Sequence, residues 1–383
     1  MKIDKTKDVL EEFLKNWNFT DTYLIYGTYT TAKSLLKKLG DKLKIAGFLD
    51  SNEEMWGKTV EGYPVFSKAE WKEKYAELKI IGASGAYTEI RASLIREGLK
   101  EQIDFCDSRF LVGSYFAVTQ NKVYLYRTDI SITECCNLRC KKCNMLMPYF
   151  ESPKHNTVES LKEDIDTYFK WVDNVQLFNI LGGEPFIYPH VEEITRYICE
   201  KYGKKIEQLV FFTNGLPRIT ESMLSVLQQY KILVQISDYR NGMPAISGRI
   251  DTLIHTLEEH HIPYRSSADT KWLDFGFPDY RNEHSSEDEM IRFFDGCYSP
   301  FRGIDGKKLY YCHLNSSAVK AGLFEDNKND YFDLEHYDEN RKRQLAAFDL
   351  GYTELGYITY CRRCKGCFAV NEDYTEVAEQ MKR

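Results

Sequence analysis

Short apolar runs alternate with amphipathic segments over the first hundred residues of this chain. The apolar runs predict strands at residues 23–26, 43–49, 78–82 and 103–106. The amphipathic segments predict helices at residues 1–17, 32–39, 68–75 and 91–97. Strands that alternate with helices form βαβ units and a parallel sheet. The first part of the chain is therefore predicted to be an α/β domain.

The periodicity lapses between Phe110 and Val123, and alternation resumes at Tyr124. Helical faces recur at 158–172, 191–198, 223–227 and 253–257, between apolar runs that predict strands. Polar motifs follow several of these runs, which is typical of barrels and open sheets that carry their chemistry at the carboxyl ends of strands. We predict three domains, at residues 1–118, 119–290 and 291–383. The central one is predicted to be a partial (β/α)6 barrel, and the last a small cysteine-rich domain.

The composition restricts the partners and the compartment. The formal charge of −7 and the pI near 5.8 argue against general binding to a nucleic-acid backbone, which favours a basic surface. No apolar run has the length of a membrane span, and residues 1–18 lack the apolar core of a signal peptide. Clustered cysteines in such a chain indicate metal ligands rather than disulfides. We expect a cytoplasmic protein.

Cys136, Cys140 and Cys143 have CX3CX2C spacing and follow the extended run 124–133. Three thiolates this close in sequence can converge on a zinc ion or an iron–sulfur cluster. A structural zinc would want a fourth ligand, and no Cys or His stands nearby at the usual spacing. A four-iron cube held by three cysteines leaves one iron open to a small molecule.

The three cysteines resemble the signature of the radical S-adenosylmethionine (SAM) enzymes, and three further motifs extend the resemblance across residues 122 to 290. The motifs are Leu181-Gly-Gly-Glu-Pro185, Phe211-Phe-Thr-Asn-Gly215 and Val234-Gln-Ile-Ser-Asp238. The resemblance implies a [4Fe–4S] cluster on the three cysteines, and SAM bound by the strand ends. The implied SAM-binding residues are Gly182, Gly183, Glu184, Pro185, Thr213, Asn214, Ser237 and Asp238. Asp238 could instead face the substrate. Lys142 replaces an aromatic residue that is common in the family, which puts the adenine contact in doubt.

Five more cysteines follow the predicted barrel: Cys297, Cys312, Cys361, Cys364 and Cys367. They resemble the auxiliary-cluster module of the SPASM and twitch subgroups, which implies a second [4Fe–4S] cluster held by Cys297, Cys312 and two of the last three. Five cysteines cannot fully ligate two cubes, so the smaller twitch form fits better. A zinc ribbon is the alternative. His313 is interpreted as a surface residue rather than a proton relay.

The N-terminal sheet has one feature of a nucleotide site. Gly27 follows the first strand, and Asp50 lies at a suitable distance for a ribose hydroxyl. Tyr29 and Ala32 stand where the dinucleotide pattern needs glycines, so tight NAD binding is disfavoured. The segment 47–65 is similar to the Rossmann-like domain that precedes sugar acyltransferases. A sugar-nucleotide or docking role and a purely structural sheet both stay open.

The resemblance implies that a reduced cluster cleaves SAM to a 5′-deoxyadenosyl radical, which removes hydrogen from a substrate carbon. We expect a carbohydrate-type substrate (a sugar, an aminocyclitol or a nucleotide-linked sugar) that undergoes dehydrogenation, dehydration or epimerisation, as for an oxidoreductase or isomerase. The alternatives are a maturase of a ribosomally made peptide and an iron–sulfur electron carrier or scaffold. The expected partners are the small substrate and a reductant such as flavodoxin or ferredoxin, with neither a membrane nor nucleic acid.

Overall fold

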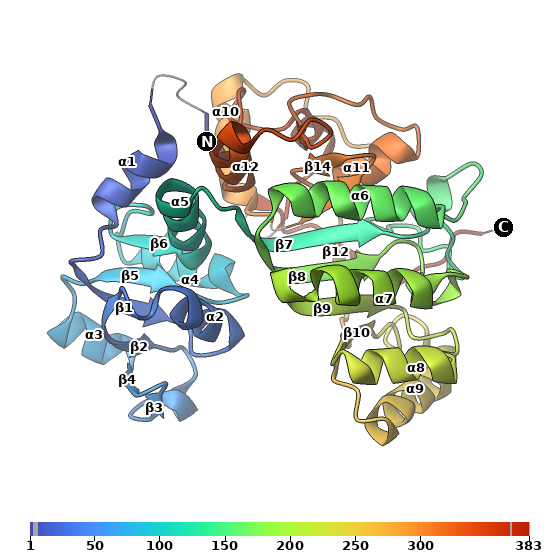
Figure 1. Cartoon of the computed structure of the whole chain (residues 1–383), viewed down its shortest axis with the longest axis horizontal. Coiled ribbons are helices and arrows are strands. Elements are labelled where there is room, and N and C mark those ends of the chain that lie inside the picture. The colour runs from blue at the N-terminus through green and yellow to red at the C-terminus, as the bar shows by residue number, and fades with distance from the viewer. Residues whose placement is uncertain (3–6, 300, 368–369, 383) are drawn as a thin grey trace. The chain divides into compact units, whose positions relative to one another are not determined.

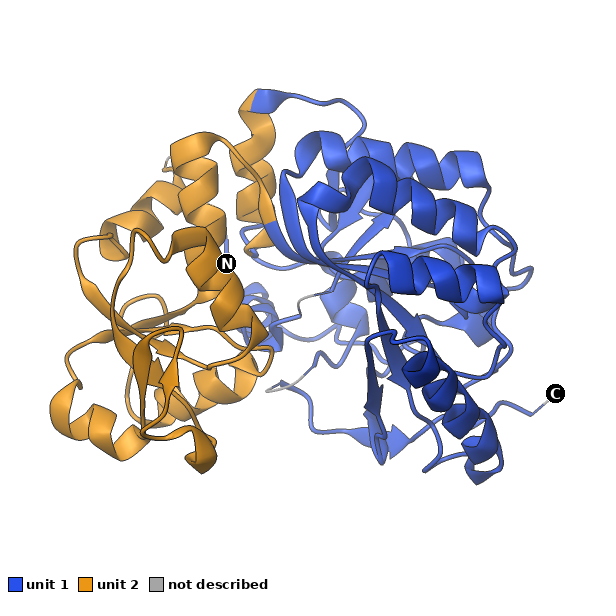
Figure 2. Ribbon diagram, turned by 60° about the horizontal axis from the view of Figure 1, so that its bottom comes forward, with its two compact units in different colours: residues 1–2, 125–339, 351–383 blue, residues 3–124, 340–350 orange. Residues whose placement is uncertain are grey.

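The computed structural model describes residues 1–2, 7–299, 301–367 and 370–382. The chain divides into two compact units, shown in different colours in Figure 2. One unit comprises residues 1–2, 125–339 and 351–383, and the other comprises residues 3–124 and 340–350. A helix from the C-terminal third of the sequence therefore belongs to the N-terminal unit.

The smaller unit contains a mainly parallel sheet, which confirms the α/β class. In the described part of the chain its strands lie in the order β3-β4-β2-β1-β5-β6, and β3 pairs antiparallel at the edge. The strands are β1 (Thr22–Tyr26), β2 (Lys44–Leu49), β3 (Thr59–Val60), β4 (Tyr63–Phe66), β5 (Lys79–Gly82) and β6 (Phe105–Asp107). The helices are α1 (Val9–Asn16), η1 (Glu53–Met55), α2 (Thr30–Leu39), α3 (Lys68–Lys74), α4 (Tyr87–Arg96), α5 (Ser108–Gln120) and α12 (Lys342–Asp349).

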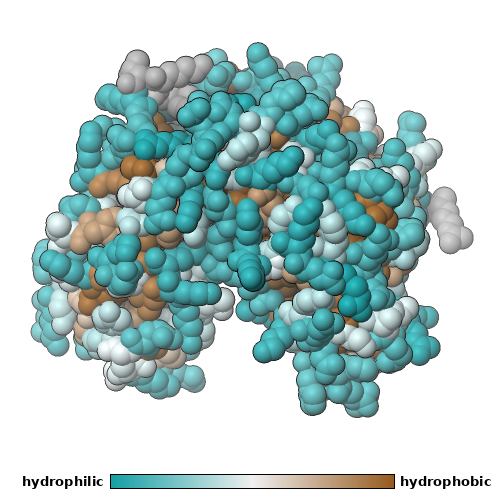
Figure 3. Space-filling view, in the orientation of Figure 1, coloured by the Kyte–Doolittle hydropathy of each residue, from teal (hydrophilic) through white to brown (hydrophobic). Residues whose placement is uncertain are grey.

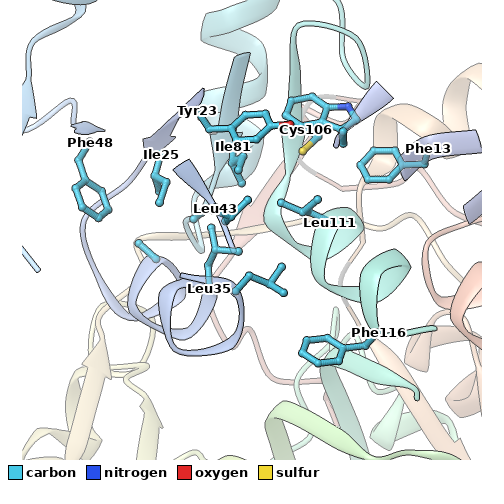
Figure 4. Packing of buried hydrophobic residues seen from close by; sticks show 14 of the residues in the cluster. Phe13, Tyr23, Ile25, Leu35, Leu43, Phe48, Ile81, Cys106, Leu111 and Phe116 are labelled. Carbon is cyan, nitrogen blue, oxygen red and sulfur yellow. The ribbon is translucent and has the colours of Figure 1, made fainter. Parts of the chain in front are cut away.

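The core of this unit lies between the sheet and helices α1, α2 and α5 (Figure 4). Tyr23 and Ile25 project from β1 toward Leu35 of α2, and Leu111 and Phe116 enter from α5. Side chains of this size contribute about 1.5–3 kcal/mol each when fully buried. The sheet and these helices therefore form one hydrophobic core.

The larger unit is built on a second, mixed sheet, with strands in the order β11-β10-β9-β8-β7-β13-β14-β15 in the described residues (Figure 1). The strands before the tail are β7 (Tyr124–Ser131), β8 (Asn174–Leu181), β9 (Ile206–Thr213), β10 (Leu233–Ser237) and β11 (Tyr264–Ser267). The helices that alternate with them are α6 (Val158–Trp171), α7 (Val191–Tyr202), α8 (Glu221–Gln229) and α9 (Ser247–Glu259). Strands β8 to β11 pair in parallel, so their carboxyl ends meet at one edge.

The cysteine-rich tail extends this sheet. Strand β13 (Arg302–Asp305) pairs parallel with β7, and β14 (Lys308–Tyr310) and β15 (Tyr331–Asp333) follow antiparallel. Its helices are α10 (Glu287–Cys297), α11 (His313–Lys320) and the short η7 (Thr359–Arg363). Strands β12 (Lys271–Leu273) and β16 (Tyr374–Glu376) form a separate antiparallel pair.

Three stretches differ from the sequence prediction. The lapse in periodicity between residues 110 and 123 predicts a break between helices and strands there. This prediction is wrong, because α5 crosses the segment. This helix packs against α1, α2 and α12, so apolar residues cover several of its sides and no polar face sets a period. The sequence of segment 272–276 predicts a loop, but its first residues belong to β12. The sequence of the acidic segment 283–289 also predicts a loop, but α10 begins at Glu287 behind a capping box of Ser286 and Glu289.

The sequence of the charged segment 325–343 predicts a solvated connection with a little helix, but one of its carboxylates is buried. Asp330 within it is fully buried, and its carboxylate accepts hydrogen bonds from the Asn315 amide, the Thr359 hydroxyl and the Tyr360 backbone. These bonds offset the cost of burying the charge. In the face shown in Figure 3, hydrophilic residues predominate and hydrophobic ones are scattered. Within the described residues, no helix is long and apolar enough to span a bilayer.

Candidate functional site

The loop with CX3CX2C spacing begins a few residues beyond the carboxyl end of β7. Cys136 and Cys143 pack against two apolar groups, one with Leu138 and Cys140 and one with Met147. The three thiols therefore lie near one another in apolar surroundings. Among the described residues, no three His, Cys, Asp or Glu side chains are grouped as for a single metal ion.

Burial raises the pKa of the Cys136 thiol to about 12 and that of Cys140 to about 11, and it also raises the pKa of Cys143. The thiolates would also repel one another. A thiolate binds a metal, so a cationic centre that contacts all three sulfurs would offset both costs. Three thiolate sulfurs that lie near one another in apolar surroundings fit an iron–sulfur cube.

Gly182 and Gly183 allow the end of β8 to approach this loop. A Cβ on Gly183 would lie 2.0 Å from the Cys135 carbonyl oxygen. Gly182 has a φ of +150°, and a Cβ on it would lie 2.4 Å from the Thr133 carbonyl oxygen. The Gly183 and Glu184 amides donate to the Thr133 and Cys135 carbonyls at 2.8 and 2.9 Å. The two glycines therefore hold the cysteine loop against the sheet.

The Glu184 carboxylate is fully buried at the junction of β8 and β9. It accepts hydrogen bonds from the Thr213 hydroxyl and the Asn214 backbone, both at 2.8 Å, and from the Phe186 backbone at 3.2 Å. Burial raises its pKa to about 7 in spite of these bonds. Pro185 begins the short helix η3 (Pro185–Ile187) beside it. Glu184, Thr213 and Asn214 thus form one network, as their positions at adjacent strand ends indicate.

Asn214 extends this network to the cysteine loop. Its side-chain amide donates to Asn137 Oδ1 at 2.7 Å and lies 3.9 Å from Cys136 Sγ. Sequence reasoning missed Asn137. Its place directly after the first cysteine is a signal that could have identified it.

Ser237 and Asp238 lie at the end of β10. Asp238 is fully buried, and its carboxylate pairs with Arg240 at 2.6 Å and accepts from the Ser266 hydroxyl at 3.2 Å. These donors lower its pKa although burial opposes them. Tyr239 follows directly, packs with the cysteine loop and makes an edge-to-face contact with Trp272 at 5.1 Å. An aromatic ring thus lies beside the cysteines. Lys142, which stands where the family commonly has an aromatic residue, pairs with Asp274.

The end of the described chain pairs with the cysteine loop, which sequence reasoning did not foresee. The Lys141 amide donates to the Glu379 carbonyl at 2.7 Å, and the Met381 amide to that of Arg139 at 2.8 Å. The Gln380 side-chain amide lies 3.3 Å from Cys140 Sγ, and Val377 packs on the same group of residues. No local pattern predicts a contact across 240 positions.

The five later cysteines also gather in one place. Cys361 and Cys364 are buried with Leu314 and Tyr360, and Cys312 packs against this group. Cys297 Sγ lies 3.5 Å from Cys367 Sγ, and this shared hydrogen bond lowers the pKa of Cys297 and raises that of Cys367. Burial, and after it repulsion from Cys297 and Cys312, raises the pKa of Cys361 and that of Cys364, as expected for thiols that lie near one another. This donor set fits a four-iron cluster and leaves one thiol over.

A polar pocket adjoins both cysteine groups. Its wall includes Met147 and Phe150, which belong to the same apolar group as Cys136 and Cys143, and His313, which follows Cys312. Its enclosed cavity is small, about 20 Å³, which is room for about one water molecule, and the rest of it is open to solvent. Its other lining residues are Asp129, Ser131, Thr133, Glu134, Gly303, Ile304, Asp305, Ser316, Ser317 and Lys320.

The interpretation of His313 as a surface residue is wrong. The side chain is buried, because α11 turns it toward β7, where Nδ1 hydrogen-bonds the Asp129 carboxylate. Asp129 also accepts from Arg127 at 2.8 and 3.0 Å and from Asn179 at 2.6 Å, and the Arg127 and His313 charges hold its pKa well below the usual range. An aspartate inside a predicted strand, at position 129, was the available signal for a buried polar partner.

Two parts of the chain match known protein families. Residues 130–237 match the Radical SAM superfamily, and residues 20–103 match a family described as C2185-like, N-terminal. The central part of the chain is therefore a radical SAM domain. The cofactors of such a domain are a [4Fe–4S] cluster and SAM, and the three thiols at 136, 140 and 143 fit that cluster.

A stretch of 112 residues, 28% of this chain, is 37% identical to the antilisterial bacteriocin subtilosin biosynthesis protein AlbA of Bacillus subtilis and covers 22% of it. A stretch of 163 residues, 38% of this chain, is 24% identical to the GTP 3′,8-cyclase of Syntrophomonas wolfei and covers 49% of it. The chain thus spans less than half the length of these curated relatives.

Two solved structures align with this chain at low sequence identity. BtrN in complex with AdoMet and 2-DOIA aligns with a TM-score of 0.44 and 12% identity, over 68% of this chain and 100% of that one. The structure of anSMEcpe with bound AdoMet aligns with a TM-score of 0.42 and 13% identity, over 64% of this chain and 89% of that one.

Proposed function

We propose that this protein is a radical SAM enzyme that removes hydrogen from a carbon of a small carbohydrate-type substrate. The observation that carries the proposal is the cysteine loop held against the buried network of Glu184, Thr213 and Asn214, with the open polar pocket beside it. A substrate in this pocket would lie beside the SAM-binding edge of the sheet. The hydroxyls and carboxylates that line it suit a polyhydroxylated molecule.

The cluster and SAM, when bound, supply a 5′-deoxyadenosyl radical. The chain's own residues position the reactants. Glu184, Thr213 and Asn214 form the polar end of the proposed SAM site, and Gly182 and Gly183 hold it against the cysteine loop. Position matters because a misplacement of about 1 Å can cost about 100-fold in rate.

We further propose that residues 291–383 hold an auxiliary [4Fe–4S] cluster on Cys297, Cys312 and two of Cys361, Cys364 and Cys367. Such a cluster can accept one electron from the substrate, and the reaction would then be a dehydrogenation. An electron donor such as flavodoxin or ferredoxin would reduce the SAM-binding cluster. Both clusters need a reducing compartment, which the cytoplasm provides.

A maturase of a ribosomally made peptide is the second candidate. It is favoured by the 37% identity to the subtilosin biosynthesis protein, although that match covers only 22% of the relative. The substrate of the relative is not transferred to this chain by so partial a match.

A label-transfer experiment separates the two candidates. The anaerobically reconstituted protein is given dithionite, SAM and either the metabolite fraction or the peptide fraction of an extract from deuterated cells of the source organism. We expect deuterium in 5′-deoxyadenosine with the metabolite fraction. Deuterium only with the peptide fraction would support the maturase instead, and no 5′-deoxyadenosine at all would refute both.

A further inference from the structure

Asp330 is a fully buried residue to which the proposed function assigns no role. Its Oδ2 accepts hydrogen bonds from the Asn315 side-chain amide at 2.8 Å, the Thr359 hydroxyl at 2.7 Å and the Tyr360 backbone amide at 3.1 Å. Its Oδ1 accepts from the Thr359 backbone amide. Two backbone amides and two side chains, all of them uncharged donors, thus meet at a single carboxylate.

Two of these donor residues belong to the segment that carries Cys361. Thr359 and Tyr360 are the first two residues of η7, and Cys361 is the third. The first amides of a helix have no partner inside the helix, so they need an acceptor from elsewhere. Asp330 supplies that acceptor for both residues and thereby fixes the place where η7 begins.

The other contacts of Asp330 belong to the segment that carries Cys312. Asn315 lies in the first turn of α11, and Cys312 is the N-cap residue of this helix. The Asp330 backbone carbonyl also accepts from the Tyr311 amide at 3.0 Å, directly before Cys312. One residue therefore connects the two cysteine-bearing segments, which are far apart in sequence.

These bonds lie in the interior of the protein. Asp330 and Asn315 are fully buried, and Tyr360 is buried with them. A buried donor that loses its acceptor cannot turn to solvent, so its loss is costly and the segment would have to move to recover a partner. The positions of the two segments therefore depend on the Asp330 carboxylate.

We propose that Asp330 is a positioning residue for the auxiliary cluster. It holds the segments of Cys312 and Cys361 in one arrangement, so that both sulfurs can reach the same cube, and it acts through their neighbours rather than as a ligand. Groups that orient metal ligands in this way typically change metal affinity by about 10–100-fold when they are replaced. The inference rests on the auxiliary cluster of the proposed function.

A protein that carries only the auxiliary site gives the clearest test. The full-length chain with Cys136→Ala, Cys140→Ala and Cys143→Ala is reconstituted without oxygen and should contain about four iron atoms. Asp330→Asn in this background keeps the shape of the side chain and replaces one acceptor oxygen by an NH2 group. We expect iron loss to a chelator to be at least about tenfold faster, and the electron paramagnetic resonance spectrum of the dithionite-reduced cluster to change.

Asp164→Asn is the matched control. The Asp164 carboxylate also accepts from two backbone amides, those of Gly306 and Lys307, at 3.1 and 2.8 Å. These amides lie in the turn between β13 and β14, a hairpin without cysteines. Asp164→Asn should lower stability in chemical denaturation and leave the spectrum and the rate of iron loss unchanged. Equal acceleration of iron loss in the two variants would show that Asp330 is merely structural and would overturn the proposal.

Thr359→Val is a milder variant that removes only the hydroxyl bond to Asp330. It should speed iron loss several-fold, and its result decides the matter if Asp330→Asn does not fold. Unchanged iron loss in the folded variants would refute the role of Asp330. Absence of iron from the background protein itself would instead refute the auxiliary cluster, and SAM cleavage by the protein with all its cysteines tests the rest of the proposed function separately.

Discussion

Single residues at the strand ends determine whether the cysteine loop can form. Gly183 has no room for a side chain, because its Cβ would lie 2.0 Å from the Cys135 carbonyl. The motif around it was visible in the sequence, and so was the need for a close backbone approach. The group that Gly183 approaches, the Cys135 carbonyl, was not visible, because the contact joins the end of β8 to a loop nearly fifty residues earlier. The sequence therefore identified Gly183 as a residue that needs a close backbone approach, and the structure identified the Cys135 carbonyl as the group that it approaches.

Gly183→Ala should destabilise the protein by about 1–3 kcal/mol and lower the iron bound per chain, because the added methyl displaces the loop backbone. Gly203→Ala is the control, since a Cβ there has nothing within 4 Å. Chemical denaturation and an iron assay check the pair. A fully loaded Gly183→Ala protein of wild-type stability would contradict this account.

Glu184 makes stability depend on pH. Burial raises its folded pKa from 4.5 to about 7, so the folded state binds the proton more tightly than the unfolded state. Protonated Glu184 therefore contributes about 3 kcal/mol to the free energy of unfolding of the protein without cofactors. This contribution is complete below about pH 4.5 and is lost as the pH rises through 7. Denaturation curves from pH 4.5 to 8 should show this slope in the wild type and a smaller one in Glu184→Gln. Identical slopes would exclude Glu184 as the source.

At the scale of elements, helices with caps and one apolar face were predicted best. The face of α6 with Leu161 and Ile165 is an example, and its N-cap Thr157 accepts from the Ser160 amide. Helix α5 was missed because its apolar residues contact several neighbours. Strand β16 and the tail beyond it pair with distant segments, and no local period marks such a pairing.

The tail over the cysteine loop should protect the bound cluster. Gln380→Ala removes the amide beside Cys140 Sγ and should speed the loss of iron to a chelator several-fold. Glu379→Ala removes only an exposed ion pair with Lys141, which is worth little, and should leave the rate unchanged. Equal rates of iron loss in the two variants would show that the tail does not protect the cluster.

At the scale of the whole molecule, cysteine spacing and the order of the motifs were enough to indicate the radical SAM domain. The α/β class was also accessible, because strands and helices alternate over most of the chain. The inclusion of α12 in the smaller unit could not be predicted, since it depends on packing between residues far apart in sequence. The burial of His313 was hidden for the same reason, as its partner Asp129 lies 184 positions earlier.

The chain should hold two cubes. Wild-type protein reconstituted without oxygen should contain about eight iron atoms per chain, and Cys297→Ala with Cys312→Ala about four. Cys106→Ala with Cys199→Ala is the matched control, since Cys106 and Cys199 belong to neither cysteine group. An iron content unchanged by the Cys297 and Cys312 substitutions would refute the auxiliary cluster.

The most direct test of the account is the cleavage of SAM at the loop that holds Cys136, Cys140 and Cys143. The reconstituted protein is incubated anaerobically with SAM and dithionite, and 5′-deoxyadenosine is measured by mass spectrometry. We predict that the wild type and Cys199→Ala form it, and that Cys140→Ala does not. No 5′-deoxyadenosine above background from a wild-type protein with its iron fully loaded would contradict the central claim.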